Sequence, residues 1–271
     1  MTKKTFSHRL RKFYDNPSDF GIRILQGGID YLRNYSYDFE KNGERNLLET
    51  FKSEKTNVIF DVGANIGDWS KIARELFPKT QIHSFELSPT TYNNLLNKLY
   101  GLEIFVNNFG LGDLDATIDF KDYGADSKVN TIILDAKYHD HKIQPKISKA
   151  RIAKGDTYCL EKKIDFIDIL KIDVEGAENL VLKGFSEMLK NKKVRLIQFE
   201  YGYTNGDSHF LMRDFYEFFN SFGYKVGKLS KKGVIFNSWN YKLNDFRSGP
   251  NYIAIQEDDK ILSDKLSKFR T

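Results

Sequence analysis

The chain has 271 residues, of which 40% are hydrophobic and 29% are charged, and its formal net charge is +5. This composition excludes an intrinsically disordered chain, and the length predicts one decorated domain. The small, dispersed positive charge does not indicate nucleic-acid binding. Because the chain has one cysteine and lacks a membrane-spanning apolar run or a signal-peptide stretch, we expect a cytoplasmic protein with no transmembrane segment.

Residues 1–55 precede the first predicted core strand and are expected to form a helical extension. Near its start, Phe6, Leu10 and Phe13 recur at helical spacing among Lys and Arg residues. Such a segment predicts an amphipathic helix docked on the body, with a membrane-surface helix or the dimerisation arm of a homodimer as alternatives. A second helix is predicted over 42–51.

The segment 58–71 carries the most informative pattern of the chain. It reads VIFDVGANIGDWSK, which predicts a buried strand, a glycine turn and the start of a helix. Glycines allow positive φ and let a ligand approach bare backbone, and the helix N-terminus offers unpaired N–H groups. This combination predicts a nucleoside-type pocket. The predicted cofactor contacts of the turn are Asp61, Gly63, Ala64, Asn65 and Gly67.

A second strand is predicted over 82–86, and its last residue, Glu86, is predicted to accept hydrogen bonds from ribose hydroxyls. The turn lacks the three-glycine G-x-G-x-x-G fingerprint that a dinucleotide pyrophosphate needs. The acid ahead of the turn, Asp61, suits a cationic group or hydroxyls, as S-adenosylmethionine (SAM) carries. NAD sites have the second acid as well, so Glu86 indicates a ribose without choosing the cofactor.

Strand and helix patterns alternate through this part of the chain. Helices are predicted over 69–77 and 89–100, and a third strand over 103–107. This alternation predicts a parallel sheet with right-handed crossovers and an active site at the carboxyl ends of the strands. After the third strand, Asn108 and Leu111 are predicted to lie near an adenine.

The pattern changes over 114–157, where short alternating runs predict a small antiparallel insertion. Its strands are expected over 116–120, 131–134 and 147–153. His139 and His141 lie between these runs, and a paired-His metal site is an alternative there. No further nearby ligand completes the spacing typical of zinc sites, so we do not assign one.

Alternation resumes with strands predicted over 166–172 and 194–199. A helix over 208–222 follows, and its aromatic stripe predicts a core-facing surface rather than a base-stacking one. Closing strands are expected over 224–228, 233–238 and 252–256. The residues from 258 to 271 predict a charged C-terminal tail, either a surface helix or a frayed end.

Five segments match a known family: VIFDVGANIGDWSK at 58–71, IHSFELSPTTYNNL at 82–95, NNFGLGD at 107–113, IDFIDILKIDVEGAENLVLKG at 164–184 and QFEYG at 198–202. They resemble the FkbM family of SAM-dependent methyltransferases, and KIDVEGAE is the more specific part. The resemblance implies an α/β, Rossmann-like class I methyltransferase fold over 56–257. Its sheet would have seven mostly parallel strands, helices on both faces and a reversed last strand.

The resemblance also implies O-methylation of a sugar, sugar nucleotide or related small metabolite. Methyl transfer is an in-line substitution, and a hydroxyl acceptor must lose a proton. Asp173, at the end of the fourth core strand, is predicted as the general base or the acceptor contact. Lys171 would hold it in place or meet an anionic group. Glu200, at the next strand end, is the second candidate base.

Acceptor contacts are predicted from Glu175, Tyr201, Tyr203 and His209. His209 could also act as a base, because an unperturbed imidazole has a pKa near neutrality. Glu178 is as readily a first-turn acid that stabilises a helix N-terminus. A divalent metal held by Asp173, Glu175 and Glu200 is allowed by their carboxylates but is not required by the sequence.

Two other functions stay open at this point. An NAD-dependent oxidoreductase would use the same sheet, and the absent third glycine argues against it. A non-catalytic nucleoside-binding module would keep the pocket alone, and the number of acids around that pocket argues against it.

Overall fold

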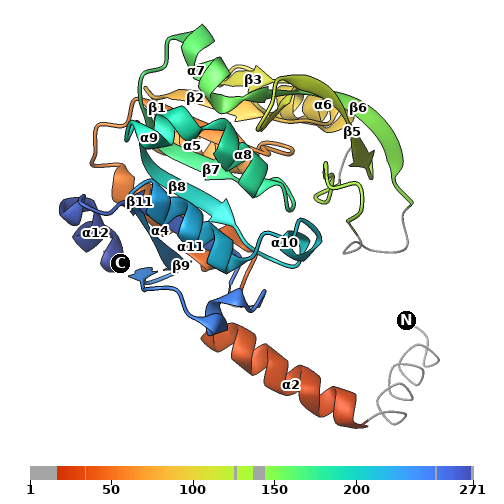
Figure 1. Ribbon diagram of the computed structural model, residues 1–271, viewed down its shortest axis with the longest axis vertical. Coiled ribbons are helices and arrows are strands. Elements are labelled where there is room, and N and C mark those ends of the chain that lie inside the picture. Colours follow the sequence, from red (N-terminus) through yellow and green to blue (C-terminus); the bar gives the residue numbers. More distant parts are fainter. Residues whose placement is uncertain (1–16, 34, 125–126, 137–143, 248, 270–271) are drawn as a thin grey trace.

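The computed structural model describes residues 17–33, 35–124, 127–136, 144–247 and 249–269 (Figure 1). The amphipathic helix expected around Phe6, Leu10 and Phe13 lies outside these residues, and so do His139 and His141.

Within the described residues, eight strands form the main sheet in the order β10-β9-β11-β8-β7-β1-β2-β3. Their bounds are β1 Val58–Val62, β2 Gln81–Phe85, β3 Phe105–Asn107, β7 Ile167–Ile172, β8 Val194–Glu200, β9 Tyr224–Ser230, β10 Gly233–Phe236 and β11 Asn251–Gln256. The strands from β8 to β3 pair in parallel, whereas β11 runs antiparallel to both β8 and β9. The class I methyltransferase fold with its reversed last strand is therefore confirmed.

The expected count of seven strands was wrong by one. Strand β10 turns back on β9 as an antiparallel hairpin and adds an eighth strand at the sheet edge. A short polar link, Lys231 and Lys232, joins the two strands. The hairpin lies far from β1 and β7 in the strand order, so it leaves the carboxyl ends of the central strands unchanged.

Helices cover both faces of the sheet, which is why the central strands β1 and β7 are apolar and buried along their whole length. Successive β1 residues point to opposite layers: Ile59 joins one apolar cluster, while Phe60 and Val62 join the other. The first cluster contains residues of α4 (Glu44–Phe51), α5 (Asp68–Leu76) and α12 (Lys260–Ser267). The second contains residues of α7 (Gly155–Lys162), α8 (Glu178–Gly184), α9 (Ser186–Lys190) and α11 (Met212–Ser221).

The C-terminal residues are more than the charged tail we expected. Helix α12 buries Leu262 and Leu266, and Phe269 beyond it is also buried. These side chains pack in the same layer as α4 and α5. A surface helix was one of the two forms expected for this segment, and its buried apolar face covers the sheet.

The insertion forms a separate three-stranded sheet in the order β4-β6-β5, with β4 Gly110–Gly112, β5 Ala116–Asp122 and β6 Lys146–Lys154. It starts earlier than position 114, and it is mixed rather than purely antiparallel because β4 pairs with β6 in parallel. The strand expected over 131–134 is not formed; Thr131 makes a single bridge to Lys121. Residues 127–131 instead run toward the main sheet.

The N-terminal extension consists of α2 (Pro17–Leu32), α3 (Phe39–Asn42) and α4. Figure 1 shows α2 projecting from the body at the lower edge of the view. The predicted helix over 42–51 corresponds to α4, which begins at Glu44. The remaining short elements are α6 (Pro89–Lys98), α10 (Thr204–Asp207) and the 3-10 helix η1 (Tyr241–Asn244).

Candidate active site

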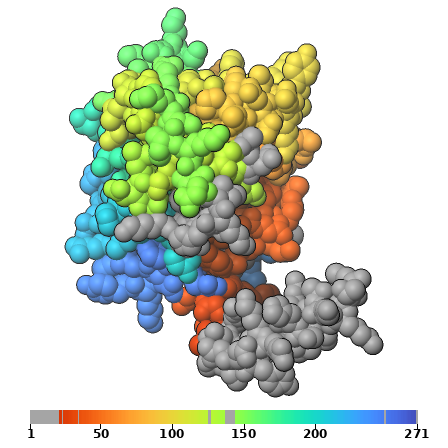
Figure 2. All heavy atoms as spheres, turned by 90° about the vertical axis from the view of Figure 1, so that its right-hand side faces the viewer, coloured from red at the N-terminus to blue at the C-terminus, as the bar shows by residue number. Residues whose placement is uncertain are grey.

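A cavity of about 500 Å³ opens at the carboxyl ends of the central strands. Parallel sheets place their sites at this edge, and the volume suits a small molecule. Its walls come from the turn after β1, the end of β2, the β7–α8 segment, the end of β8, residues 127–132 and part of the N-terminal extension. Figure 2 looks onto the face where N-terminal residues, in red, approach green residues of the insertion.

The turn after β1 has the geometry that its glycines predict. Gly63 has φ +79°, and a Cβ added there would lie 1.8 Å from the carbonyl oxygen of Asp173, so only glycine fits. The N–H groups of Gly63 and Ala64 both donate to the carbonyl of Phe85, at 3.0 and 2.9 Å. The turn is therefore pinned to two neighbouring strand ends. Gly67, with φ +89°, begins α5.

Glu86 lines the cavity beside this turn and is only 6% exposed. One carboxylate oxygen accepts the N–H of Asn65 at 3.0 Å, and the other accepts the N–H of Ser88 at 2.9 Å. Burial raises the pKa of Glu86 to about 7, although these backbone hydrogen bonds oppose the shift. Each oxygen retains acceptor capacity, so the carboxylate can still accept a pair of hydroxyls.

Asp61 and Asn108, both predicted to contact the cofactor, do not line the cavity. The Asp61 carboxylate is fully buried and accepts hydrogen bonds from Ser70 Oγ at 2.6 Å and Lys171 Nζ at 3.2 Å. The Asn108 amide donates to the Glu86 carbonyl at 3.2 Å. Both predictions are therefore corrected: these residues position other groups. Leu111, Gly63, Ala64 and Asn65 do line the cavity, whereas Gly67, the N-cap residue of α5, does not.

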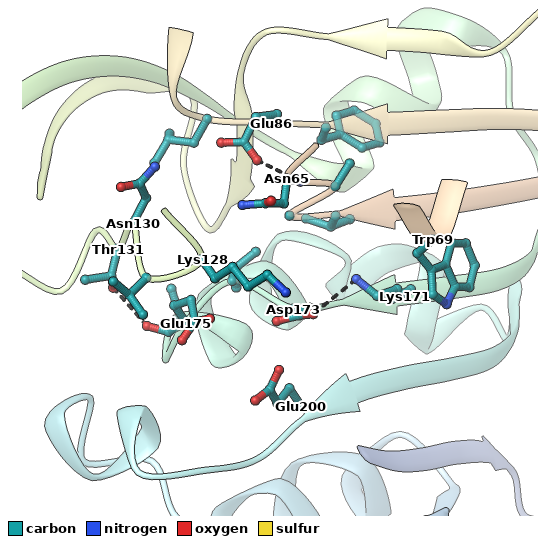
Figure 3. Close-up of a pocket in the computed structure, with 18 of the residues that line it drawn as sticks. Asn65, Trp69, Glu86, Lys128, Asn130, Thr131, Lys171, Asp173, Glu175 and Glu200 are labelled. Atoms are coloured by element: carbon teal, nitrogen blue, oxygen red, sulfur yellow. Dashed lines mark hydrogen bonds and ion pairs between the residues drawn. The ribbon is translucent and has the colours of Figure 1, made fainter. Parts of the chain in front are cut away.

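Lys171 links Asp61, which lies in β1, to Asp173, which follows β7. Its Nζ lies 3.2 Å from Asp61 Oδ1 and 3.3 Å from Asp173 Oδ2, with the side chain 7% exposed. Burial alone would lower the pKa of Lys171, but the charges of Asp61, Asp173 and Glu44 outweigh it and raise the pKa. The ammonium therefore stays charged and holds Asp173 at the cavity wall (Figure 3).

Asp173, Glu175 and Glu200 form an acid cluster in the cavity wall. Burial raises the pKa of Glu200 well above its usual range, and the charge of Asp173 adds to the effect. Burial acts on Asp173 too, but Lys171 and a hydrogen bond with Glu200 hold the Asp173 pKa below its usual value. The opposite shifts favour Asp173 as the ionised member of the pair and Glu200 as the protonated member, which donates a hydrogen bond to Asp173. Burial and the charge of Asp173 also raise the pKa of Glu175.

Glu178 has the structural role that its place at a helix start allows. One oxygen accepts the N–H groups of Val174 and Gly176, at 3.0 and 3.2 Å, and the other accepts Asn205 Nδ2 at 2.8 Å. The residue is 1% exposed. It therefore shapes the KIDVEG turn that presents Asp173 and Glu175.

Two of the predicted acceptor contacts are wrong. Tyr201 is fully buried, and its hydroxyl donates to the Asn244 carbonyl at 3.1 Å, so it belongs to the core. His209 is exposed and does not line the cavity. Tyr203 does line it, with its ring centroid 5.4 Å from that of Phe246. Alternation along β8 and the turn after it explains this: Glu200 faces the cavity whereas Tyr201 faces inward.

Residues 127–131 contribute a cavity wall that the sequence did not indicate. Asn65 Nδ2 donates to the Ser127 carbonyl at 2.9 Å, and Thr131 Oγ1 donates to the Glu175 carbonyl at 2.9 Å. The segment is thus hydrogen-bonded both to the turn after β1 and to the segment between β7 and α8. Figure 3 shows Lys128 reaching toward Asp173. No periodic pattern marks this segment, and only its tertiary contacts reveal it.

The N-terminal extension contributes a second unpredicted wall through Tyr37, Phe39 and Glu44. Glu44 is 8% exposed and accepts hydrogen bonds from Asn42 Nδ2 and Gln198 Nε2, both at 2.5 Å. Trp69, at the start of α5, also lines the cavity. These positions lie outside the motif segments or on their buried side, so the sequence patterns did not single them out.

Among the described residues, no set of three His, Cys, Asp or Glu side chains is arranged to hold a metal ion. None of the helices in the described ranges has the length and apolar character needed to cross a bilayer.

The sheet order, the glycine turn and the cavity at the strand ends define a class I methyltransferase. Residues 61–226 match the Methyltransferase FkbM domain, and the chain belongs to this family.

Three curated relatives are similar to parts of the chain. Methyltransferase 1 of Beauveria bassiana is 26% identical over 48% of this chain and 59% of its own length. The 2-O-methyltransferase NoeI of Sinorhizobium fredii is 27% identical over 53% of this chain and 63% of its own. The hexuronic acid methyltransferase AglP of Haloferax volcanii is 27% identical over 67% of this chain and 66% of its own. The matches therefore span about three fifths to two thirds of the relatives.

Proposed function

We propose that this protein transfers a methyl group from SAM to a hydroxyl of a sugar or a related small metabolite. One observation carries the proposal: Glu86 and Asp173 line the same cavity. Glu86 follows β2 and Asp173 follows β7, with β1 between them in the sheet. A donor held at Glu86 and an acceptor held at Asp173 would therefore meet above the glycine turn of β1.

The residues on the Glu86 side fit SAM. The Glu86 carboxylate can accept a ribose diol, while Leu87 and Leu111 offer apolar surface for a base. The Asp173 carboxylate suits a positively charged ligand. SAM, when bound, supplies an activated methyl group on a sulfonium. The protein's own task is then to align the acceptor and to remove its proton.

Asp173 is the residue we assign to that proton. Its ionised carboxylate can accept the acceptor hydroxyl, and Lys171 and Glu200 keep it ionised. Bound SAM would supply the methyl group, with the sulfur–methyl bond breaking and the thioether S-adenosylhomocysteine as the leaving group; the role of Asp173 Oδ would be to take the hydroxyl proton of the acceptor. Thr131 and Asn65 hold the neighbouring segment 127–131 across this side of the cavity.

Family membership supports methyl transfer over the NAD-dependent alternative. Support for an oxygen acceptor comes from the relatives named as a 2-O-methyltransferase and a hexuronic acid methyltransferase. Sugars present many hydroxyls, and carboxylates accept several hydroxyl hydrogen bonds at once. The acid cluster therefore suits a polyhydroxylated acceptor.

Two measurements test the proposal. Titration calorimetry with SAM and with NAD should give binding of SAM only; binding of NAD alone would overturn it. Methyl transfer from labelled SAM should then be assayed against a panel of methyl glycosides and sugar nucleotides. SAM binding with no methyl transfer to any acceptor would favour the non-catalytic module.

A further inference from the structure

We infer that Tyr37 forms an aromatic wall of the acceptor half and stacks on the ring of a pyranose sugar. The inference rests on the proposed function and adds a specificity-determining residue to it. Tyr37 lies in the N-terminal extension, outside the family-matched range 61–226. The acceptor is thus selected partly by a segment that the shared domain does not contain.

The N-terminal segment is anchored firmly enough to build a site. Arg247, in the loop before β11, pairs with Asp30 at the end of α2, with Nε to Oδ1 at 3.2 Å. Arg33 pairs with Asp245 in the same loop. The Arg247 guanidinium lies 5.4 Å from the ring centroid of Tyr35 and also contacts Tyr203. The segment that carries Tyr37 is therefore held against a cavity-lining part of the body.

Tyr37 stands at the mouth of the cavity beside the acids. Its ring meets Tyr35 edge-on, with centroids 5.5 Å apart, and their hydroxyls are 3.1 Å apart. A Cβ built on Gly202 would lie 3.8 Å from the Tyr37 hydroxyl and 3.9 Å from Glu200 Oε1. The tyrosine and Glu200 thus border the same small space. Tyr37 is 61% exposed, so an incoming ligand would cover surface that now faces solvent.

The pairing of an aromatic face with carboxyl groups matches the two surfaces of a pyranose. The C–H groups on the face of a sugar ring carry slight positive charge and are attracted to the negative face of an aromatic ring. The hydroxyls at the ring edge donate to carboxylates. Tyr37 supplies the first kind of contact; the Asp173 carboxylate supplies the second, and the carboxyl groups of Glu175 and Glu200 add further hydrogen-bond partners for the hydroxyls.

Gly202 keeps this space open. Its amide is fixed by a hydrogen bond to Asn205 Oδ1 at 2.8 Å. A Cβ there meets its neighbours only at ordinary contact distance, so a larger side chain can be accommodated by the backbone. Beyond Cβ, however, a leucine would enter the space between Tyr37 and Glu200. The glycine is therefore a second, independent position at which the acceptor can be excluded.

The test uses saturation-transfer NMR of the full chain with methyl α-glucopyranoside, which needs no turnover. Wild type should transfer saturation to the ring C–H protons, and Tyr37→Ala should lose most of that signal. Tyr37→Phe should retain it, because the ring face remains. Tyr31→Ala is the matched control, since Tyr31 lies in the same extension, is 86% exposed and does not line the cavity. Gly202→Leu should lose the signal as Tyr37→Ala does.

Kinetics give a second readout with whichever glycoside is methylated. Tyr37→Ala should raise the acceptor KM by about three- to tenfold and leave the SAM Kd unchanged, as expected for loss of one aromatic contact. Equal NMR signals in wild type, Tyr37→Ala and Gly202→Leu would overturn the inference, as would a wild type with no signal. Failure to bind SAM would instead count against the proposed function.

Discussion

The two halves of the cavity are built in different ways. The donor half uses residues close together in the chain: Gly63 to Gly67 and Glu86, joined by backbone hydrogen bonds. The acceptor half draws Tyr37, Lys128 and Glu200 from segments that are far apart in the chain. In the proposed function, the donor would therefore be bound mainly by one local motif, whereas the acceptor would be bound by residues that only tertiary contacts bring together.

The strongest test removes the proposed base from the acceptor half. Asp173→Asn should lower kcat by about 10²- to 10⁴-fold, because a positioned proton acceptor is lost. The SAM Kd, measured by calorimetry, should stay near the wild-type value. Asp165→Asn, an exposed aspartate outside the cavity, is the control. Unchanged turnover in Asp173→Asn would move the base elsewhere.

The second test breaks the link between the halves. Lys171→Met should leave Asp61 buried without its cation and reduce the free energy of unfolding by about 3–5 kcal/mol. Asp61→Asn combined with Lys171→Met should recover part of that loss, because the buried charge is removed too. Denaturant titration of the wild type, the two single variants and the double variant measures the coupling free energy between Lys171 and Asp61. Additive losses would mean that the two side chains do not depend on each other.

The third test weakens the donor half alone. Glu86→Gln should weaken SAM binding by about 10- to 100-fold. A charged acceptor contributes more to a hydrogen bond than a neutral one, and the NH₂ group of glutamine would face one of the two backbone N–H groups that Glu86 now accepts. The acceptor KM at saturating SAM should not change. A large change in that KM would show that the halves are not separate. Glu75→Gln, outside the cavity, provides the matched control.

The same substitution has a consequence for pH. Glu86 has a usual pKa of 4.5 and a folded-state pKa of about 7, so the folded chain binds more protons between these values. Glu86 therefore makes the free energy of unfolding fall as pH rises from about 4.5 to about 7. Glu86→Gln should make that decline shallower. Denaturant titrations of ligand-free protein at pH 5 and pH 8 measure it, and an equal decline in both proteins would contradict the assignment.

The smallest effect concerns the contact between the donor turn and the segment 127–131. Asn65→Gly keeps the positive φ of this position and the N–H bond to Glu86, but it removes the amide that donates to Ser127. Loss of this one hydrogen bond should cost about 0.5–1.5 kcal/mol. Faster hydrogen exchange in segment 127–131, with the SAM Kd changed only severalfold, is expected. Unaltered exchange would mean that the remaining contacts of the segment, made by Asn130 and Thr131, are enough to hold it.

The sequence predicted well what depends on local pattern. The strand–turn–helix at 58–71, the acid at Glu86 and the strand ends at Asp173 and Glu200 all have the expected neighbours along the chain. Periodicity also located most core strands, because burial on both faces demands long apolar runs. A strand was predicted over 233–238, but the resemblance implied seven strands, so its place as an eighth strand paired with β9 was not expected.

What could not be predicted depends on which way a side chain points. Asp61 and Tyr201 occupy the expected elements but face inward. Asp61 accepts a hydrogen bond from Lys171 instead of contacting the cavity. Tyr37 and Lys128 carry no motif, and only the folded chain brings them to the cavity. His209 was proposed because of its residue type, yet its side chain is exposed and does not line the cavity.

Gly63 has one more consequence. Because no side chain fits between its Cα and the Asp173 carbonyl, the backbone itself acts as a spacer between the turn after β1 and the strand end that carries the proposed base. The distance between the proposed donor and acceptor positions is then set by main-chain packing. Substitutions of side chains at the mouth of the cavity should not change that distance. Retargeting the protein to other acceptors should therefore begin at Tyr37 and Gly202, where the opening can be reshaped without disturbing that spacing.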